Sequence, residues 1–318
     1  MNLKRYLPIL DWAPKYGREQ ATSDLVAAII VTVMLIPQSL AYALLAGLPA
    51  QVGLYASILP LVIYAVFGTS RTLSVGPVAV ASLMTAAALA PLAESGTPEY
   101  VAGAVLLAVM SGLMLTLMGV LRLGFLANFL SHPVISGFIT ASGIVIAASQ
   151  LKHIFGIQAS GHNLLEIAHS LLGSIGDTNL ATLGVGAGAL IFLMLARKRL
   201  KPLLMAMGLA PRMADILTKT APILAVLVTT LVAWQFQLDG QGVRLVGDVP
   251  RGLPDFTMPS LDMGLWQQLA VSALLISVVG FVESVSVGQT LAAKRRQRID
   301  PDQELIGLGT ANLGAGFS

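Results

Sequence analysis

The sequence predicts an all-α polytopic membrane protein, and composition, apolar runs and charge distribution all point to this class. Hydrophobic residues make up 55% of the 318 residues and charged residues only 11%, whereas a soluble domain carries about a quarter. Apolar runs of roughly 18 residues are long enough to cross a bilayer as helices. Such runs lie near 24–45, 50–67, 77–93, 100–121, 128–149, 180–196, 221–236 and 266–292, with a shorter one at 302–315.

The distribution of Lys and Arg predicts a cytoplasmic N-terminus. If residues 1–23 are cytoplasmic, alternating the spans leaves only Lys152, Arg244 and Arg251 in outer loops, while Arg71 falls in an interrupted span. The acidic residues divide almost evenly between the two sides, so the bias belongs to the cations, as the positive-inside rule requires. The basic clusters therefore indicate topology, and no nucleic-acid partner is predicted.

Several other classes of function find no support in the sequence. There is no cysteine, and the four histidines (132, 153, 162 and 169) form no ligand set at metal spacing. No nucleophile–base pair or Walker loop is present, so neither an enzyme nor a cofactor is predicted. The glycine-rich "GLGTANLGAG" lacks the strand and the lysine of a phosphate loop, and helix packing explains it better.

Glu283 is the one acidic residue that falls deep in a predicted span, in "ISVVGFVESVSVGQTLAAKRR". A carboxyl at that depth costs a few kcal/mol on insertion scales, so it should face a cavity or a partner. A carboxylate lining a transport path is the favoured interpretation. A glutamic acid hydrogen-bonded between helices is the alternative.

The stretch "FGTSRTLSVGPVAVASLM" (67–84) predicts a helix that begins inside the membrane. The apolar run after it rises only about 24 Å as a helix, less than the hydrocarbon core. Pro77 suits the first helical position, and Gly76 allows close approach of a backbone or a ligand. Free N–H groups of Val78, Ala79 and Val80 would favour an anion. A kinked scaffold helix is the alternative.

The first span holds a second predicted interruption, at Pro37 in "MLIPQSLAYALL". Gln38 and Tyr42 follow at i and i+4 and therefore share a face. They form either a polar lining or interhelical hydrogen bonds. The segments "LIPQSLAYA" and "GFVESVSVG" match faintly when they are aligned, with Gln38 at the position of Glu283. This weak repeat hints at two related halves, and it predicts that the chain is an N-terminal part of the protein.

At these residues the chain resembles the sulfate permease (SulP) family of anion transporters, the bacterial relatives of solute-carrier family 26. "LPAQVGLYASILPLVIYAVFGTSRTLSVGPVAVASLM" is similar to the family signature ending in G-[ST]-S-[RK], followed by S-V-G-P. "IPQSLAYALLAGL", "SHPVISGFITASG", "SQLKHIFGI" and "ELIGLGTANLGAGF" also resemble family segments, so the likeness covers essentially the whole chain. Val52 departs from the signature, which more often has tyrosine.

The resemblance implies the 7+7 inverted-repeat transporter fold of nucleobase, bicarbonate and sulfate carriers, with half-helices, here truncated after about span 9. Segment 1–23 would be cytoplasmic, and 24–122 would hold spans 1–4 of the core (transport) domain. Spans 5–7 of the gate domain would occupy 123–240, and 241–262 would be an extracytoplasmic linker. Spans 8–9 of the core would occupy 263–318, with span 10 onward and the STAS domain absent.

The resemblance also implies an anion site between half-helices and beside spans 1 and 8. Carried over to this sequence, its substrate-binding residues are Gln38, Tyr42, Gly76, Val78 and Ala79, and its coupling residue is Glu283. A sodium-coupled bicarbonate branch resembles this region but has threonine where this chain has Val287. Because a hard cation needs several oxygen ligands, this loss favours a proton as the coupling ion.

The implied function is secondary active transport of an inorganic oxyanion, sulfate first, by an elevator mechanism. The carrier would be a homodimer in the lipid bilayer of a bacterial cytoplasmic membrane. Bicarbonate, chloride or a dicarboxylate as substrate, and sodium as coupling ion, stay open. Competing interpretations are a channel-like anion pore, a nucleobase permease and a non-transporting membrane scaffold or sensor.

Overall fold

The computed structural model describes residues 6–128, 132–159, 161, 164–245, 252 and 256–317, and its regular elements are all helices. Residues 246–251 and 253–255 of the predicted linker 241–262, and His162, lie outside the described residues. The α-helices are α2 (Ile9–Trp12), α3 (Arg18–Leu45), α4 (Ala50–Tyr55), α5 (Leu59–Phe67), α6 (Ala79–Leu89), α7 (Pro98–Val120), α8 (His132–Phe155), α9 (Leu164–Ser174), α10 (Leu180–Leu195), α11 (Lys201–Ala206), α12 (Pro211–Lys219), α13 (Ala221–Gln235), α14 (Met263–Lys294) and α15 (Pro301–Gly316). Short 3₁₀ or π turns are η1 (Ala13–Lys15), η2 (Leu123–Asn128), η3 (Ile175–Asp177), η4 (Ala196–Leu200) and η5 (Leu238–Gln241).

Helices long and apolar enough to cross a membrane occupy five of the predicted runs. In the described residues these are α3, Ala50–Phe67, α7, Leu180–Ala206 and α14. Met213–Lys219 and Ala221–Gln235, bent by 47° relative to each other, would add a sixth span. The helix α3 continues through Pro37, so the interruption expected there is not formed.

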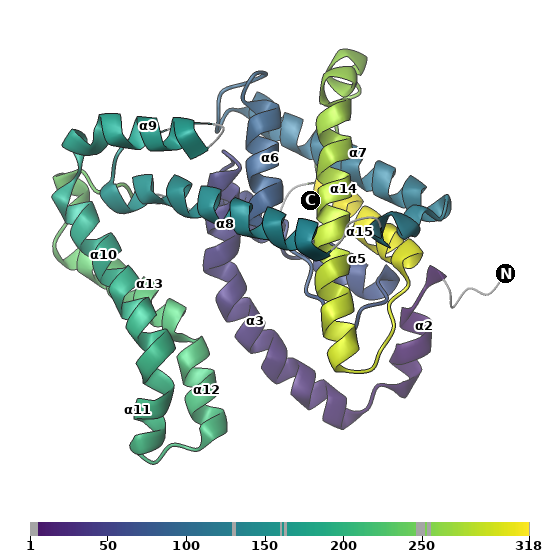
Figure 1. The fold of residues 1–318 in the computed structure, drawn as a ribbon, viewed down its shortest axis with the longest axis horizontal. Coiled ribbons are helices and arrows are strands. Elements are labelled where there is room, and N and C mark those ends of the chain that lie inside the picture. The colour runs from purple at the N-terminus through teal and green to yellow at the C-terminus, as the bar shows by residue number, and fades with distance from the viewer. Residues whose placement is uncertain are drawn as a thin grey trace. The chain divides into compact units, whose positions relative to one another are not determined.

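The chain divides into two compact units, which are described separately (Figure 1). The first comprises residues 1–21, 38–137 and 249–318, and the second comprises residues 22–37 and 138–248. In the second unit α10 packs against α13, and α11 packs against α12. A salt bridge of 2.9 Å from Lys201 to Asp215 joins α11 to α12, and Lys219, within α12, also contacts Asp215 at 2.7 Å.

The core of the first unit consists of two apolar clusters around α7, α14 and α15. One joins α5, α7, α14 and α15 through Tyr64, Leu115, Met118, Phe281, Val282, Val285, Leu305, Leu308 and Ala311. The other joins α6, α7 and α14 through Leu89, Tyr100, Leu106, Leu107, Met110, Leu269 and Ala273. The second cluster holds the C-terminal end of α6, at Leu89, beside α7 and α14.

Small residues let α15 cross α7 at close range, as the interpretation of "GLGTANLGAG" expected. A Cβ atom at Gly309 would lie 2.6 Å from the backbone N of Thr116 and 2.8 Å from the carbonyl O of Gly112. At Gly119 it would lie 2.9 Å from the carbonyl O of Asp302. Close backbone approach through small residues is a usual way for membrane helices to associate. The glycine-rich stretch of α15 is therefore a packing surface.

Candidate functional site

The helix α6 starts after eleven residues without regular structure, 68–78, which follow the end of α5. With 11 residues, α6 rises only about 16 Å. The expectation that Pro77 is the first helical residue is wrong, because the helix begins at Ala79. Val78, in an extended conformation (φ −126°, ψ 144°), is its N-cap. Proline disfavours helical geometry in the residue before it, so Gly76 and Pro77 extend the irregular segment.

The N-terminus of α6 exposes backbone donors that no side chain caps. Its first intrahelical bond runs from the N–H of Ser82 to the carbonyl O of Val78, at 3.0 Å, so the N–H groups before Ser82 have no helical partner. Four other helices, α7, α10, α14 and α15, begin with a side-chain cap, whereas Val78 has no side chain that can accept a hydrogen bond. These free donors and the helix dipole favour a negative charge at this point.

Gln38 and Tyr42 lie on one face of α3, as their spacing predicts. The Nε2 of Gln38 donates to the Tyr42 hydroxyl at 3.1 Å. The next residue, Ser39, is fully buried, and its Oγ lies 2.7 Å from the Oγ of Ser57. In the described part of the chain no hydrogen bond joins Gln38 or Tyr42 to α6 or to Glu283. The structure therefore does not itself connect this pair to the helix start.

Glu283 lies on α14, between buried residues that pack against the irregular segment. Its Oε2 is the buried side-chain oxygen that has no hydrogen-bond partner among the described residues. Its neighbours Phe281, Val282 and Val285 belong to the apolar cluster onto which Leu73 and Val75 pack, and α14 also packs against α6. The turn of α14 that carries Glu283 thus packs against the chain that leads to α6.

Glu304, on α15, is a buried acid that the sequence analysis did not single out. It is 0% exposed. Its Oε2 accepts from the hydroxyl of Tyr64 at 2.6 Å, and its Oε1 accepts from the N–H groups of Thr69 at 2.7 Å and Ser70 at 3.0 Å, and from the Thr69 hydroxyl. Because Glu304 stands in the first turn of a helix, the sequence alone suggested a water-exposed end. The available sequence signal for this polar helix start was the run "DPDQE" (300–304), which leads into the apolar part of α15.

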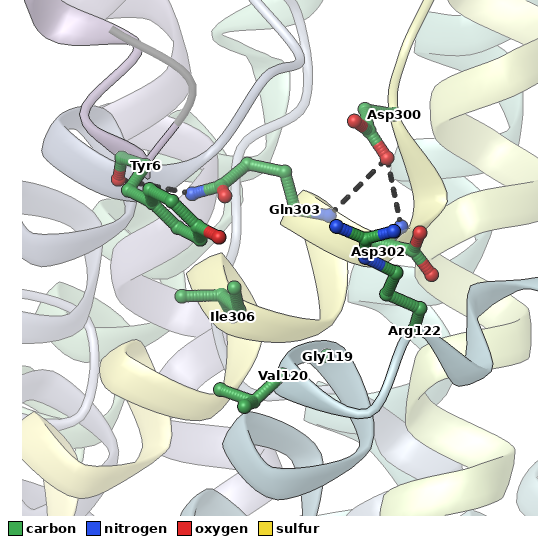
Figure 2. A pocket seen from close by; sticks show the side chains of 8 residues that line it. All are labelled: Tyr6, Gly119, Val120, Arg122, Asp300, Asp302, Gln303 and Ile306. Carbon is green, nitrogen blue, oxygen red and sulfur yellow. Dashed lines mark hydrogen bonds between the residues drawn. The ribbon is translucent and has the colours of Figure 1, made fainter. Parts of the chain in front are cut away.

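A small cavity lies beside the start of α15 (Figure 2), and it contains none of the predicted site residues. Asp300 accepts there from the N–H groups of Asp302 at 3.0 Å and Gln303 at 3.4 Å, while the Gln303 side chain donates to the carbonyl O of Tyr6 at 3.1 Å. The cavity lining is Tyr6, Gly119, Val120, Arg122, Asp300, Asp302, Gln303 and Ile306. Its volume, about 50 Å³, suits a few water molecules.

The described residues contain no group of three or more His, Cys, Asp or Glu side chains placed to hold a metal ion. What the site offers is backbone donors, an amide–phenol pair and one unsatisfied carboxyl. Backbone donors of this kind can hold an anion, and a carboxyl can take up a proton.

Comparison with known proteins identifies the family. A profile described as the sulfate permease family matches residues 22–318. The chain belongs to the sulfate permease family. Sulfate transporter 4.1, chloroplastic, of Arabidopsis thaliana is 38% identical over 98% of this chain and 44% of its own length. The probable sulfate transporter MT1781 of Mycobacterium tuberculosis is 36% identical over 96% of this chain and 53% of its own length.

The solved structure of SLC26A9 matches this chain with a TM-score of 0.85 and 28% identity, covering 99% of the chain and 50% of SLC26A9. The predicted fold class is thereby confirmed: an all-α polytopic membrane protein of the 7+7 inverted-repeat type. The chain spans about half the length of the curated relatives it matches.

Proposed function

We propose that the full-length protein carries out secondary active transport of an inorganic oxyanion, with sulfate as the first choice, and couples it to protons. The observation that carries the proposal is the uncapped N-terminus of α6, reached by an irregular segment in a chain of apolar helices. Family membership and the names of the sulfate transporters among its relatives support the choice of substrate.

The anion binds at the N–H groups of α6, with Gly76, Val78 and Ala79 forming the wall. Irregular backbone at membrane depth is tolerated where it lines a cavity, and half-helix N-termini bind anionic substrates in other transporters. Gln38 and Tyr42 supply an amide and a phenol from α3. This part of the site brings only neutral donors, which hold an oxyanion and also allow its release.

Glu283 takes up and releases the coupling proton. Its Oε2 lacks a partner among the described residues, and its turn of α14 packs against the segment before α6. A proton on this carboxyl offsets the charge of an anion bound nearby. Val287, four residues on, supplies no side-chain oxygen for sodium.

The transport movement is of the elevator type. The core domain is formed by 24–122 and 263–318 and slides against a gate domain at 123–240. The packing of α6, α7, α14 and α15 around shared clusters supports a core that moves as one body. The protein works as a homodimer in a bacterial cytoplasmic membrane with its N-terminus in the cytoplasm.

Uptake by the full-length protein in proteoliposomes tests the function. Labelled sulfate, bicarbonate, chloride and succinate are offered with no gradient, with an inward proton gradient or with an inward sodium gradient. We expect saturable sulfate uptake that the proton gradient increases. Stronger uptake of another anion would identify that anion as the substrate. A response to the sodium gradient alone would identify sodium as the coupling ion. Non-saturable flux indicates a channel-like pore, and uptake of none of the anions refutes transport of this class.

Glu283→Gln is expected to remove the response of uptake to the proton gradient, because glutamine keeps the size and polarity of the side chain but carries no titratable proton. Exchange of labelled for unlabelled sulfate should persist, since the anion site itself is intact. The matched control is Glu99→Gln, the same change at an exposed residue in the first turn of α7. Uptake by Glu283→Gln with an unchanged pH dependence would contradict the proton role.

A further inference from the structure

We propose that Glu304 is a positioning residue for the anion site: from α15 it fixes the start of segment 68–78 and, through that segment, the N-terminus of α6. The inference rests on the proposed function in that it takes the helix start to be the place where the anion binds. Glu304 itself acts at a distance, through the backbone that it holds.

The contacts of Glu304 converge on two consecutive residues of the segment. Its Oε1 receives the N–H groups of Thr69 and Ser70 and the hydroxyl of Thr69, while Oε2 receives the hydroxyl of Tyr64. The Thr69 hydroxyl in turn accepts from the N–H of Asp300 at 3.2 Å, which orients its own hydrogen toward Glu304. A backbone N–H group is only a donor, so these contacts need an acceptor oxygen at this point.

Among the described residues, Glu304 has no cationic partner to explain its burial. Within the described residues it forms no ion pair. It stands in the first turn of α15, where the helix dipole favours an acidic group. The donors that satisfy it come from the end of α5 and from segment 68–78, so its burial serves to join α15 to that segment. Buried polar groups that lose such partners are costly, which makes the contact specific.

Further contacts extend the anchoring along the segment toward α6. A Cβ atom at Gly307 would lie 3.0 Å from the Cα of Gly68, so α15 touches the segment where it begins. The Ser70 side chain accepts from the N–H of Leu73 at 3.2 Å, and Leu73 and Val75 pack onto the core cluster of α5, α7, α14 and α15. Only Gly76, Pro77 and Val78 separate the anchored part from Ala79. A displacement at residues 69–70 is therefore transmitted to the helix start.

Two variants separate the reach of the side chain from its charge. Glu304→Gln keeps the length and an acceptor oxygen for the donors of Thr69 and Ser70, and its amide can donate to the Tyr64 hydroxyl. Glu304→Asp keeps the carboxylate but withdraws it by about 1.5 Å, one carbon–carbon bond. If Glu304 positions the segment, glutamine will act as wild type and aspartate will not.

The control variant is Asp302→Ala, two residues earlier on α15. Its Oδ1 accepts from the N–H of Gly124 at 2.8 Å, and so it anchors η2 and not segment 68–78. Loss of this contact weakens the same helix end without touching residues 69–70. An effect of Glu304→Asp that Asp302→Ala does not reproduce is therefore specific to the segment.

The experiment measures concentration-dependent uptake of labelled sulfate by the full-length protein, together with hydrogen–deuterium exchange of peptides covering 68–78. For Glu304→Asp we expect KM to rise about tenfold, with a smaller change in the saturating rate per folded transporter, and faster exchange at 68–78. Glu304→Gln should match wild type in both measurements. Asp302→Ala should keep the wild-type KM and the wild-type exchange at 68–78.

The proposal is overturned if Glu304→Asp keeps the wild-type KM, if Asp302→Ala raises KM equally, or if Glu304→Gln behaves like Glu304→Asp. If the wild-type protein takes up no anion, the proposed function fails and the exchange data alone decide about positioning. Faster exchange at 68–78 in Glu304→Asp, absent in Glu304→Gln and Asp302→Ala, then supports it. Equal exchange in all variants refutes it.

Discussion

Val78→Asp is expected to abolish sulfate uptake while the transporter stays folded. Aspartate is among the best N-cap residues, and Val78 already has the extended backbone of an N-cap, so the change should stabilise α6 locally. Its carboxylate, however, takes the free N–H groups and repels an arriving anion. Two unit charges about 4 Å apart at an effective dielectric constant of about 20 repel by about 4 kcal/mol, which corresponds to about thousandfold weaker binding.

Two substitutions at the same position serve as controls for this variant. Val78→Ala adds no hydrogen-bond acceptor at the N-cap and should leave most of the uptake. Val78→Asn caps the helix without a charge and should give an intermediate loss. Uptake is measured in proteoliposomes, with the folded fraction taken from size-exclusion chromatography. If Val78→Asp transports as well as Val78→Ala, the anion does not bind at the start of α6.

The sequence predicted the helices well because length and hydrophobicity determine which segments suit a bilayer. The start of α6 was misplaced by two residues, since the preference of proline for the first helical turn competes with its preference for an extended preceding residue. Pro37 was expected to interrupt α3, but the helix continues through it. Proline in a membrane helix is tolerated where neighbouring groups satisfy the freed carbonyl.

Fewer of the polar contacts of the site could be predicted from the sequence. The spacing of Gln38 and Tyr42 was enough to place them on one face, because i and i+4 contacts are local. Glu304 was missed because its partners lie more than 200 positions away, at Tyr64, Thr69 and Ser70. Hydropathy treats an acid at a helix end as exposed, and only the packing of α15 against α5 shows that this one is buried.

Gly309→Val is expected to prevent correct folding of the first unit. The added atoms would meet backbone atoms of Thr116 and Gly112 on α7, at 2.6 Å and 2.8 Å from the new Cβ. A backbone cannot turn aside as a flexible side chain can, so α15 and α7 must separate. Overpacking alone costs about 1–3 kcal/mol, and the separation would also loosen Leu305, Leu308 and their cluster.

Gly188→Val on α10 is the matched control, because a Cβ atom there has nothing within 4 Å. We expect Gly309→Val to lose the monodisperse peak in detergent and to lower the thermal midpoint, and Gly188→Val to do neither. Wild-type behaviour of Gly309→Val would mean that the close crossing of α7 and α15 is not required for the fold.

The first turn of α15 makes helical register unusually important for this chain. Three consecutive side chains reach three different segments: Asp302 bonds to Gly124, Gln303 bonds to the carbonyl O of Phe67 and Glu304 bonds to Thr69. Inserting one residue into this turn would rotate each later side chain by about 100° around the helix axis. All three attachments would then be lost at once, whereas a substitution at one of these positions removes only one of them.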